Sequence, residues 1–283
     1  MKKAILLFAF AALSLQNINA TKRIYTKTDS IRAEKIMKQA SSQPAGTNTI
    51  VYIGRQLLGV PYVAQTLEKG KTEKLVINTM QLDCTTFVEN VLAMYLCVQN
   101  KTTRFADFCS NIQKIRYAGG KVSYPSRLHY FSTWIEDNTK KGIVQEQQAP
   151  NPPFTAKQTI MANFMSTHAD RYPMLKGKQQ WIKQIADMEK SITGTRQKYI
   201  PTKAVTNSNV VRKTVHNGDI IAIVTTKAGL EISHIGIAVW HKDGLHMLNA
   251  SSLYHKVVED NNLLQTYLRN QKTALGIRIA RPL

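Results

Sequence analysis

Cys84 is the residue whose type and position best suit covalent chemistry. It stands in the run Asp83-Cys84-Thr85-Thr86, directly before an apolar stripe of helical period formed by Phe87, Val88, Val91, Leu92 and Tyr95. Cys84 lies at or just before the first helical turn, whether Asp83 caps the helix or Thr86 does so with Glu89 closing a capping box. There the free N–H groups and the positive end of the helix dipole favour a thiolate. Cys84 is therefore a candidate nucleophile, although a small buried residue preceding a helix would look the same.

A cysteine nucleophile needs a base, and His234 is the best of the seven histidines for that role. It opens an alternating run of apolar and small residues that ends at Trp240, where an imidazole needs a partner if it is buried. The alternative is a histidine at a strand end that faces solvent. No pair shows His-x-x-x-His or Cys-x-x-Cys spacing, so we expect neither a metal site nor a cofactor.

Asn249 is the candidate for orienting this histidine, because it shares a sheet face with His234 for any even-numbered loop between their strands. A four-residue loop over 241–244 places Asn249 diagonally one pair away, within reach of the imidazole. If Asp243-Gly244 alone forms the turn, Asn249 falls too far along, and Ser251 or a bulge is needed instead. The sequence leaves this register open, and Asn249 could also be a plain strand-edge residue.

The elements that position these residues change from helical to strand patterns along the chain. Helical spacing covers 24–40 and 50–58, then the segment after Cys84, then 105–115, and it resumes near Met161 and Trp181. A polar segment over 145–153 carries three prolines and is expected to be a linker or long surface loop. Strand patterns follow over 220–225, 233–240 and 245–251. Helices followed by an antiparallel sheet indicate an α+β fold in one elaborated domain.

The first twenty residues read as a secretory signal peptide, with Lys2 and Lys3 before an apolar run and cleavage expected after Ala20. Removing it takes two of the 38 basic residues and none of the 18 acidic ones, which leaves a net charge of +18. We expect a soluble periplasmic or extracellular protein, because no later apolar run is long enough to cross a membrane. Export argues against nucleic acid as the partner of this charge, and the scattered lysines and arginines favour a solvated surface.

Two further cysteines, Cys97 and Cys109, accompany Cys84 in a compartment that is expected to be oxidising. An odd number of cysteines leaves at least one free thiol or an intermolecular bridge. Cys97 and Cys109 could pair with each other, but both lie in apolar surroundings that equally suit an inert buried thiol.

Four short blocks together resemble the active-site blocks of the NlpC-type papain-like cysteine peptidases. They are Gly59-Val60-Pro61-Tyr62, Asp83-Cys84-Thr85-Thr86-Phe87-Val88, Ser233-His234-Ile235-Gly236-Ile237 and Leu248-Asn249-Ala250-Ser251. The Asp-Cys-Thr-Thr form and the stretch Pro125-Ser126-Arg127-Leu128-His129-Tyr130 are most similar to the bacterial N-acetylmuramoyl-L-alanine amidase-like family. The resemblance implies a papain-like core, with a central helix packed on an antiparallel sheet, and an added helical segment around 124–192.

The same resemblance implies a peptidoglycan hydrolase that cuts between N-acetylmuramate and the L-Ala of the stem peptide. Cys84 would be the nucleophile and His234 the base, oriented by Asn249, and the partners would be muropeptides bound by a monomer. The residues expected to contact substrate are Tyr62, Asp83, Ser126, Arg127, His129 and Ser233.

Two departures from the superfamily pattern bear on the bond that is cut. Thr85-Thr86 stand where Ser-Gly usually follows the cysteine, and Asn249 stands where histidine is frequent. In the γ-D-glutamyl-diamino acid endopeptidases that serine helps hold a free amino terminus, so Thr85 favours the amidase. The alternatives are the endopeptidase and a non-catalytic basic protein that binds the cell wall.

Overall fold

The computed structural model describes residues 23–283, so the predicted signal peptide lies outside the described residues. A short parallel pair joins β1 (Arg23–Ile24) to β2 (Leu75–Val76). The other strands form one eight-stranded sheet, in the order β4-β5-β10-β6-β7-β8-β9 with β3 also paired to β10. Every pairing within this sheet is antiparallel.

The part of the sheet from β10 to its edge at β9 consists of strands from the last third of the chain. They are β6 (Ile220–Thr225), β7 (Ile232–Trp240), β8 (Leu245–Ser251), β9 (Lys256–Glu259) and β10 (Ala274–Pro282). All residues of β6 and β8 are buried, because both faces of the sheet are covered. This explains the continuous apolar run over 220–225.

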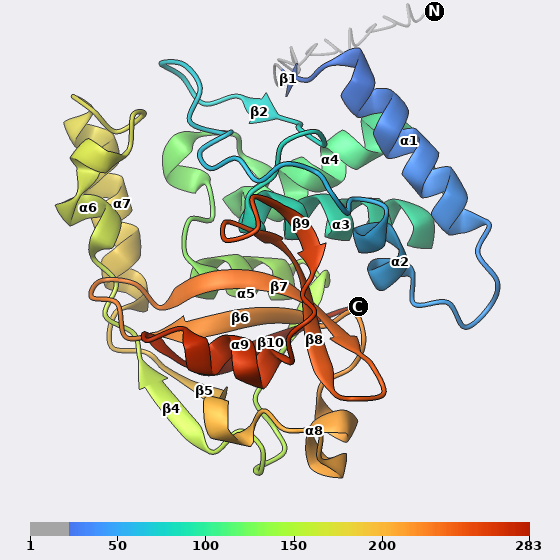
Figure 1. The fold of residues 1–283 in the computed structure, drawn as a ribbon. Helices are drawn as coiled ribbons and strands as arrows, with labels where there is room; N and C mark the ends of the chain where they lie inside the picture. Colours follow the sequence, from blue (N-terminus) through green and yellow to red (C-terminus); the bar gives the residue numbers. More distant parts are fainter. Residues whose placement is uncertain (1–22) are drawn as a thin grey trace, which may run out of the picture.

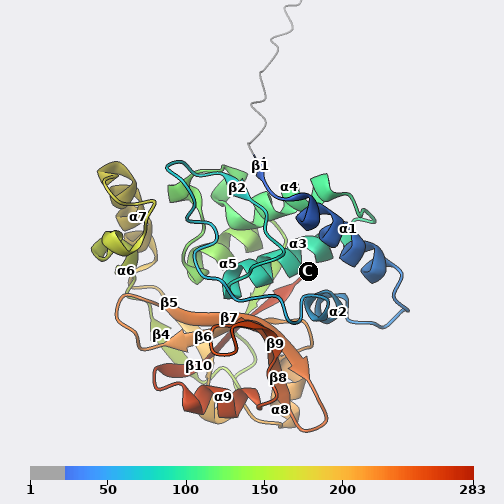
Figure 2. The ribbon, with the colours of Figure 1, turned by 45° about the horizontal axis from the view of Figure 1, so that its top comes forward.

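One face of the sheet carries α3 (Cys84–Gln99), which contacts β7 and β8 (Figures 1 and 2). Around it pack α1 (Lys27–Ser41), α2 (Thr49–Arg55) and α4 (Phe105–Arg116). Their apolar side chains form one core with α3 and the facing side chains of β7 and β8. The predicted α+β fold, with a central helix on an antiparallel sheet, is confirmed, and the predicted N-terminal helices lie close to their expected ranges.

The opposite face of the sheet is covered by α8 (Asn209–Thr214) and α9 (Leu264–Asn270), below the sheet in Figure 2. Leu264 and Leu268 are fully buried against apolar side chains of β6 and β10. Sequence patterns did not indicate either helix, because six or seven residues are too few to display helical periodicity.

The segment 124–192 contains α5 (Phe131–Lys140), α6 (Phe164–Thr167) and α7 (Gln179–Ile192), but also β3 (Val144–Gln147) and β4 (Ala156–Thr159). The strand β5 (Arg196–Pro201) follows directly after it. The helical description of this segment is therefore incomplete. β3 and β4 are short and polar and pair on one side only, so neither has the alternating apolar pattern of a half-buried strand. Part of the expected loop over 145–153 thus belongs to the sheet.

A separate apolar cluster holds α6 and α7 to the turn around Tyr124. Figure 1 shows these two helices standing to one side of the main body. No helix within residues 23–283 has both the length and the apolar character needed to cross a membrane.

Candidate active site

Cys84 is the first residue of α3, and Asp83 is its N-cap. The Asp83 carboxylate accepts from the Thr86 backbone N–H at 2.8 Å, and the Thr86 hydroxyl accepts from the Asp83 N–H at 2.9 Å. This reciprocal cap fixes the start of the helix one residue before the cysteine. The partly exposed thiol therefore lies beside the free N–H groups of the first turn, where a negative charge is stabilised.

His234 and Asn249 are brought together by the register of β7 and β8. Trp240 pairs with Leu245 and Ile237 pairs with Leu248, so the connecting loop spans the four residues 241–244. Nε2 of His234 lies 3.0 Å from Oδ1 of Asn249, whose side chain is fully buried. Because Oδ1 can only accept, Nε2 carries the proton of this bond and Nδ1 is the ring nitrogen left for another partner.

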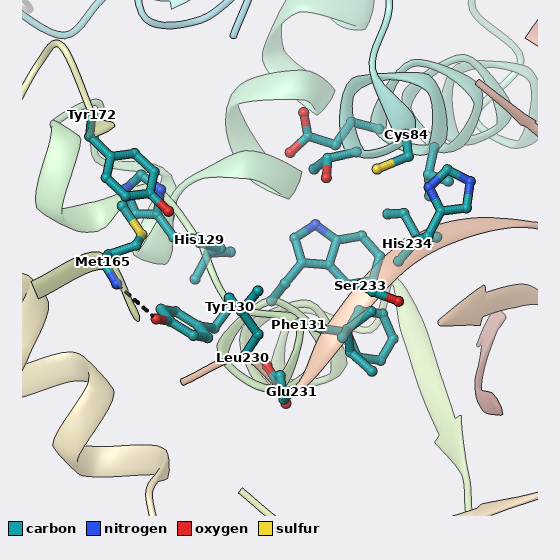
Figure 3. A pocket seen from close by; sticks show the side chains of 17 residues that line it. Cys84, His129, Tyr130, Phe131, Met165, Tyr172, Leu230, Glu231, Ser233 and His234 are labelled. Carbon is teal, nitrogen blue, oxygen red and sulfur yellow. Dashed lines mark hydrogen bonds between the residues drawn. The ribbon is translucent and has the colours of Figure 1, made fainter. Parts of the chain in front are cut away.

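Cys84 lines the same pocket as the imidazole and acts on its charge. Burial by itself lowers the pKa of His234. The charge of a Cys84 thiolate, the hydrogen bonds to Cys84 and Asn249 and the nearby Asp83 outweigh burial and raise that pKa above its ordinary value. Figure 3 shows Cys84 and His234 together at one end of a pocket. The arrangement stabilises the protonated imidazole of His234 beside Cys84.

Gly236 allows β8 to approach closely enough for this contact. A Cβ atom at Gly236 would lie 2.6 Å from Cγ of Met247 and 3.0 Å from Cβ of Asn249. Any larger residue would push β8, and Asn249 with it, away from the imidazole. The glycine of the Ser233-His234-Ile235-Gly236-Ile237 block is thus explained by packing.

A pocket of about 750 Å³, counting its open mouth, extends from Cys84 and His234 into the fold. One wall is the first two turns of α3, and another is the start of β7 with the residues before it. The far end belongs to the added segment, which contributes His129, Tyr130, Met165 and Tyr172 (Figure 3).

Two buried carboxyl groups in this pocket escaped the sequence analysis. Glu89, one turn beyond Cys84, accepts from Nε of Arg116 at 2.7 Å, yet burial outweighs this pairing and raises the pKa of Glu89. Glu231 accepts from the Ser132 N–H at 2.7 Å and from Arg278 at 2.9 Å. A charged residue inside an otherwise apolar helical stretch was the available signal for Glu89, which was considered only as a capping residue.

His129 lies in the pocket wall, where Nε2 is 3.0 Å from the carbonyl oxygen of Tyr124. Loss of solvation, helped by the Arg127 charge, lowers the pKa of His129 to about 3 against the opposing effect of the Tyr124 carbonyl. The ring is therefore neutral at ordinary pH. Its Nε2 donates to Tyr124, which leaves Nδ1 as a bare acceptor.

Of the other expected contact residues, Ser233 also lines the pocket, whereas Ser126 and Arg127 do not. The Arg127 guanidinium is buried and bonded to Glu73 and Glu68, two almost fully buried carboxylates. The Ser126 hydroxyl donates to the Ser123 carbonyl at 2.9 Å and so closes a local turn. Both residues border a different surface depression. The expectation that they form the wall of the Cys84 pocket was wrong, because internal polar partners hold them elsewhere.

Tyr62 and Tyr267 lie near Cys84 without lining the pocket. Burial, with the charges of Cys84 and Asp83, raises the pKa of Tyr62 to about 12. The Tyr267 ring, on α9, has its centroid 6.5 Å from that of His234. Tyr267 was not found from sequence because its helix shows no motif.

Comparisons with known proteins agree with this fold. A model of the N-acetylmuramoyl-L-alanine amidase-like family matches residues 52–277. An N-acetylmuramoyl-L-alanine amidase from Bacteroides uniformis is 32% identical, with a TM-score of 0.76 over 89% of this chain and 99% of its own. A Bacteroides fragilis protein described as a candidate xylanase is 40% identical, with a TM-score of 0.75 over 81% of this chain and 98% of its own.

A Legionella pneumophila protein at 23% identity shares the fold, with a TM-score of 0.65 over 90% of this chain and 94% of its own. The comparison with curated proteins gave no match. Because the family model covers most of the chain, the protein belongs to the N-acetylmuramoyl-L-alanine amidase-like family. Membership and the structural relatives support an amidase that acts on peptidoglycan.

Proposed function

We propose that this protein is a cysteine-dependent amidase that cleaves the bond between N-acetylmuramate and the L-Ala of the stem peptide. The observation that carries the proposal is the alignment of Cys84, His234 and Asn249, with the His234–Asn249 hydrogen bond at 3.0 Å. A helix-terminal thiol, an imidazole and a group that orients the imidazole suffice for acyl transfer.

In this proposal the Cys84 thiolate attacks the lactyl carbonyl carbon of muramate and forms a tetrahedral intermediate. The Cys84 backbone N–H, at the start of α3, would donate to its oxyanion. The imidazolium of His234 gives its proton to the L-Ala nitrogen as the carbon–nitrogen bond breaks, which leaves a thioester on Cys84. His234 then takes one proton from water, which attacks the thioester carbonyl, and the carbon–sulfur bond breaks to release the Cys84 thiolate. The carboxylic acid formed loses the second proton to solvent and leaves as the muramate carboxylate.

The pocket supports the choice of bond. An enzyme that cuts after muramate must hold a sugar on the acyl side of the scissile carbonyl, which requires room beside Cys84. The far wall formed by His129, Met165 and Tyr172 supplies a mixed polar and aromatic surface of the kind that binds sugars. A γ-D-glutamyl endopeptidase would instead bind the free amine of L-Ala at that position, and Thr85 stands where such enzymes use serine.

Glycoside hydrolysis, suggested by the description of the Bacteroides fragilis relative, is supported less well. It needs one carboxyl group free to act as an acid and a second free to act as a base or nucleophile. Both carboxyls of the pocket are instead ion-paired, Glu89 with Arg116 and Glu231 with Arg278.

A non-catalytic protein that only binds the cell wall is also supported less well. Such a protein would not need an imidazole beside a thiol at a helix start, so this alternative does not explain why Cys84 and His234 lie together.

The substrate also bears on location, since a peptidoglycan amidase with an N-terminal export signal would act in the periplasm or outside the cell. We therefore propose that the protein acts in the periplasm or outside the cell and that Cys84 is its catalytic nucleophile.

The deciding experiment is mass spectrometry of digests of two matched substrates, N-acetylmuramoyl-tetrapeptide and the same tetrapeptide without sugar. We expect free N-acetylmuramate and intact tetrapeptide from the first substrate and no reaction with the second. Release of L-Ala-D-Glu from the sugarless peptide, with the muramoyl substrate untouched, would favour the endopeptidase. Wild-type protein that binds sacculi but processes neither substrate would favour the wall-binding alternative.

A further inference from the structure

The Cys84 pocket contains a buried hydrogen-bond donor without a protein partner. Trp134, on α5, lines the pocket and is 4% exposed. Its Nε1–H is buried and finds no acceptor among the residues that the structure describes. A buried N–H is nearly always paired in proteins, and leaving it unpaired costs about 1–3 kcal/mol. A ligand carbonyl would provide the missing acceptor.

Two acceptors lie in the same pocket. Nδ1 of His129 is left as an acceptor because Nε2 donates to the Tyr124 carbonyl. Glu89 receives its Arg116 bond on Oε2, and no donor to Oε1 is found within residues 23–283. The residues that line the pocket therefore include one unpaired donor and two unpaired acceptors.

Apolar side chains complete the pocket near these atoms. Met165 and Leu230 contribute no polar group to it, and Figure 3 shows both around its inner end. The Tyr130 hydroxyl is occupied, since it donates to the Glu189 carboxylate at 2.6 Å. A ligand group that fits must combine a carbonyl, an N–H or O–H donor, and a small apolar end.

A secondary amide with a methyl cap has all three features, whereas a carboxylate, a hydroxyl and an ammonium group each lack at least one. A carboxylate has no donor and would meet the buried Glu89 and Glu231. A hydroxyl has no apolar end, and an ammonium group cannot accept from the Trp134 N–H.

We infer that this pocket is an acetamido-binding subsite, in which Trp134 donates to the carbonyl oxygen, His129 or Glu89 accepts from the N–H, and Met165 and Leu230 contact the methyl group. The inference rests on the proposed function, which supplies a substrate with an N-acetyl sugar next to the scissile bond. It adds that the enzyme selects its substrate by the acetyl group and assigns this selection to Trp134.

The test compares N-acetylmuramoyl-tetrapeptide with its N-deacetylated form, which carries a free amine at the same carbon. We expect wild-type kcat/KM to favour the acetylated substrate by at least about tenfold, as the loss of one well-placed hydrogen bond predicts. Trp134→Phe keeps an aromatic ring but removes the donor. It should lower kcat/KM for the acetylated substrate by about tenfold and barely change that for the amine.

Trp240→Phe is the matched control, because the Trp240 Nε1–H donates to the Val215 carbonyl and Trp240 does not line the pocket. This variant should keep the wild-type preference. Equal wild-type kcat/KM for the two substrates would overturn the inference. So would an equal loss on both substrates in Trp134→Phe, since that result would assign Trp134 a structural role only.

Binding to the inactive variant Cys84→Ala separates this inference from the proposed function. Calorimetry should show tighter binding of the acetylated than of the deacetylated compound, and addition of Trp134→Phe should remove the difference. If the wild type hydrolyses neither compound but Cys84→Ala still prefers the acetyl group, the proposed reaction fails while the subsite stands. Equal affinity of Cys84→Ala for both compounds would overturn the subsite even if hydrolysis is observed.

Discussion

The 3.0 Å contact between Nε2 of His234 and Oδ1 of Asn249 joins neighbouring strands and determines which ring nitrogen faces Cys84. Asn249 follows Leu248, which pairs with Ile237, and its Cβ lies close to Gly236, so the amide reaches the imidazole diagonally. Nδ2 of Asn249 donates to the Met247 carbonyl at 3.3 Å, which keeps Oδ1 turned toward the ring. A fully buried amide in this position holds one tautomer of the imidazole and one orientation.

Asn249→Ala should therefore change the pH profile as well as the rate. The Asn249 hydrogen bond is one of the contacts that raise the pKa of His234, so its loss should lower that pKa. His234 then loses its proton at lower pH, and the alkaline limb of kcat/KM should move to lower pH. The maximal rate should fall by roughly one to two orders of magnitude. His241→Gln, which alters a histidine paired with Glu259 far from Cys84, should leave the profile unchanged.

Cys84→Ser should abolish hydrolysis without unfolding the protein. The serine hydroxyl fits the same space, but the imidazole does not ionise it as it does a thiol, so kcat should fall by at least about 10³-fold. Circular dichroism and the thermal midpoint should stay close to those of the wild type. Retention of the wild-type rate would rule out the cysteine mechanism.

Iodoacetamide should label the three thiols at very different rates at neutral pH. Cys84 is partly exposed and contacts His234, whereas Cys97 and Cys109 are buried, and burial raises the pKa of each to about 11. Peptide mapping should find Cys84 modified first, and His234→Gln should slow that reaction. Equal labelling of all three cysteines in folded protein would count against an activated Cys84.

Arg127→Ala should destabilise the protein. The substitution leaves Glu68 and Glu73 buried without their cation, and breaking a buried pair in this way costs about 3–5 kcal/mol. Urea unfolding should show this loss. Arg104→Ala is the control, because Arg104 is exposed in its pair with Asp107, and its unfolding curve should stay close to that of the wild type. An Arg127→Ala protein of wild-type stability that fails only with muramoyl substrates would restore the substrate-binding role.

Local signals in the sequence predicted that a helix starts at or just after Cys84, because two candidate N-caps, Asp83 and Thr86, lie on either side of it. The structure selects Asp83. The local signals also predicted that Asn249 shares a face with His234, since side chains alternate along a strand and any loop with an even number of residues gives this result. The register itself depends on the length of the loop between the two strands. Local sequence does not determine that length, because the preference of the turn residues is weighed against the pairing of the whole strands. Arg127 was misassigned for a related reason: a guanidinium in a motif gives no indication of Glu68 and Glu73, more than fifty residues away, which neutralise it. The place of Trp134 and Glu89 in the pocket could not be predicted from the sequence, because the pocket is enclosed by elements that lie far apart in the chain.

The half-buried His129 predicts a specific response of stability to acid. Its pKa in the folded protein is about 3, below the ordinary value of 6.5, so the unfolded chain binds a proton that the folded protein does not bind between these values. The stability of the wild type should therefore fall as pH drops from 6.5 toward 3. His129→Gln cannot take up this proton, so the variant should lose roughly 2–3 kcal/mol less than the wild type between pH 7 and pH 4. Urea titrations of both proteins at the two pH values measure this difference independently of any constant effect of the substitution. Parallel losses in the two proteins would mean that His129 takes up its proton in the folded protein as readily as in the unfolded chain, which would contradict the lowered pKa.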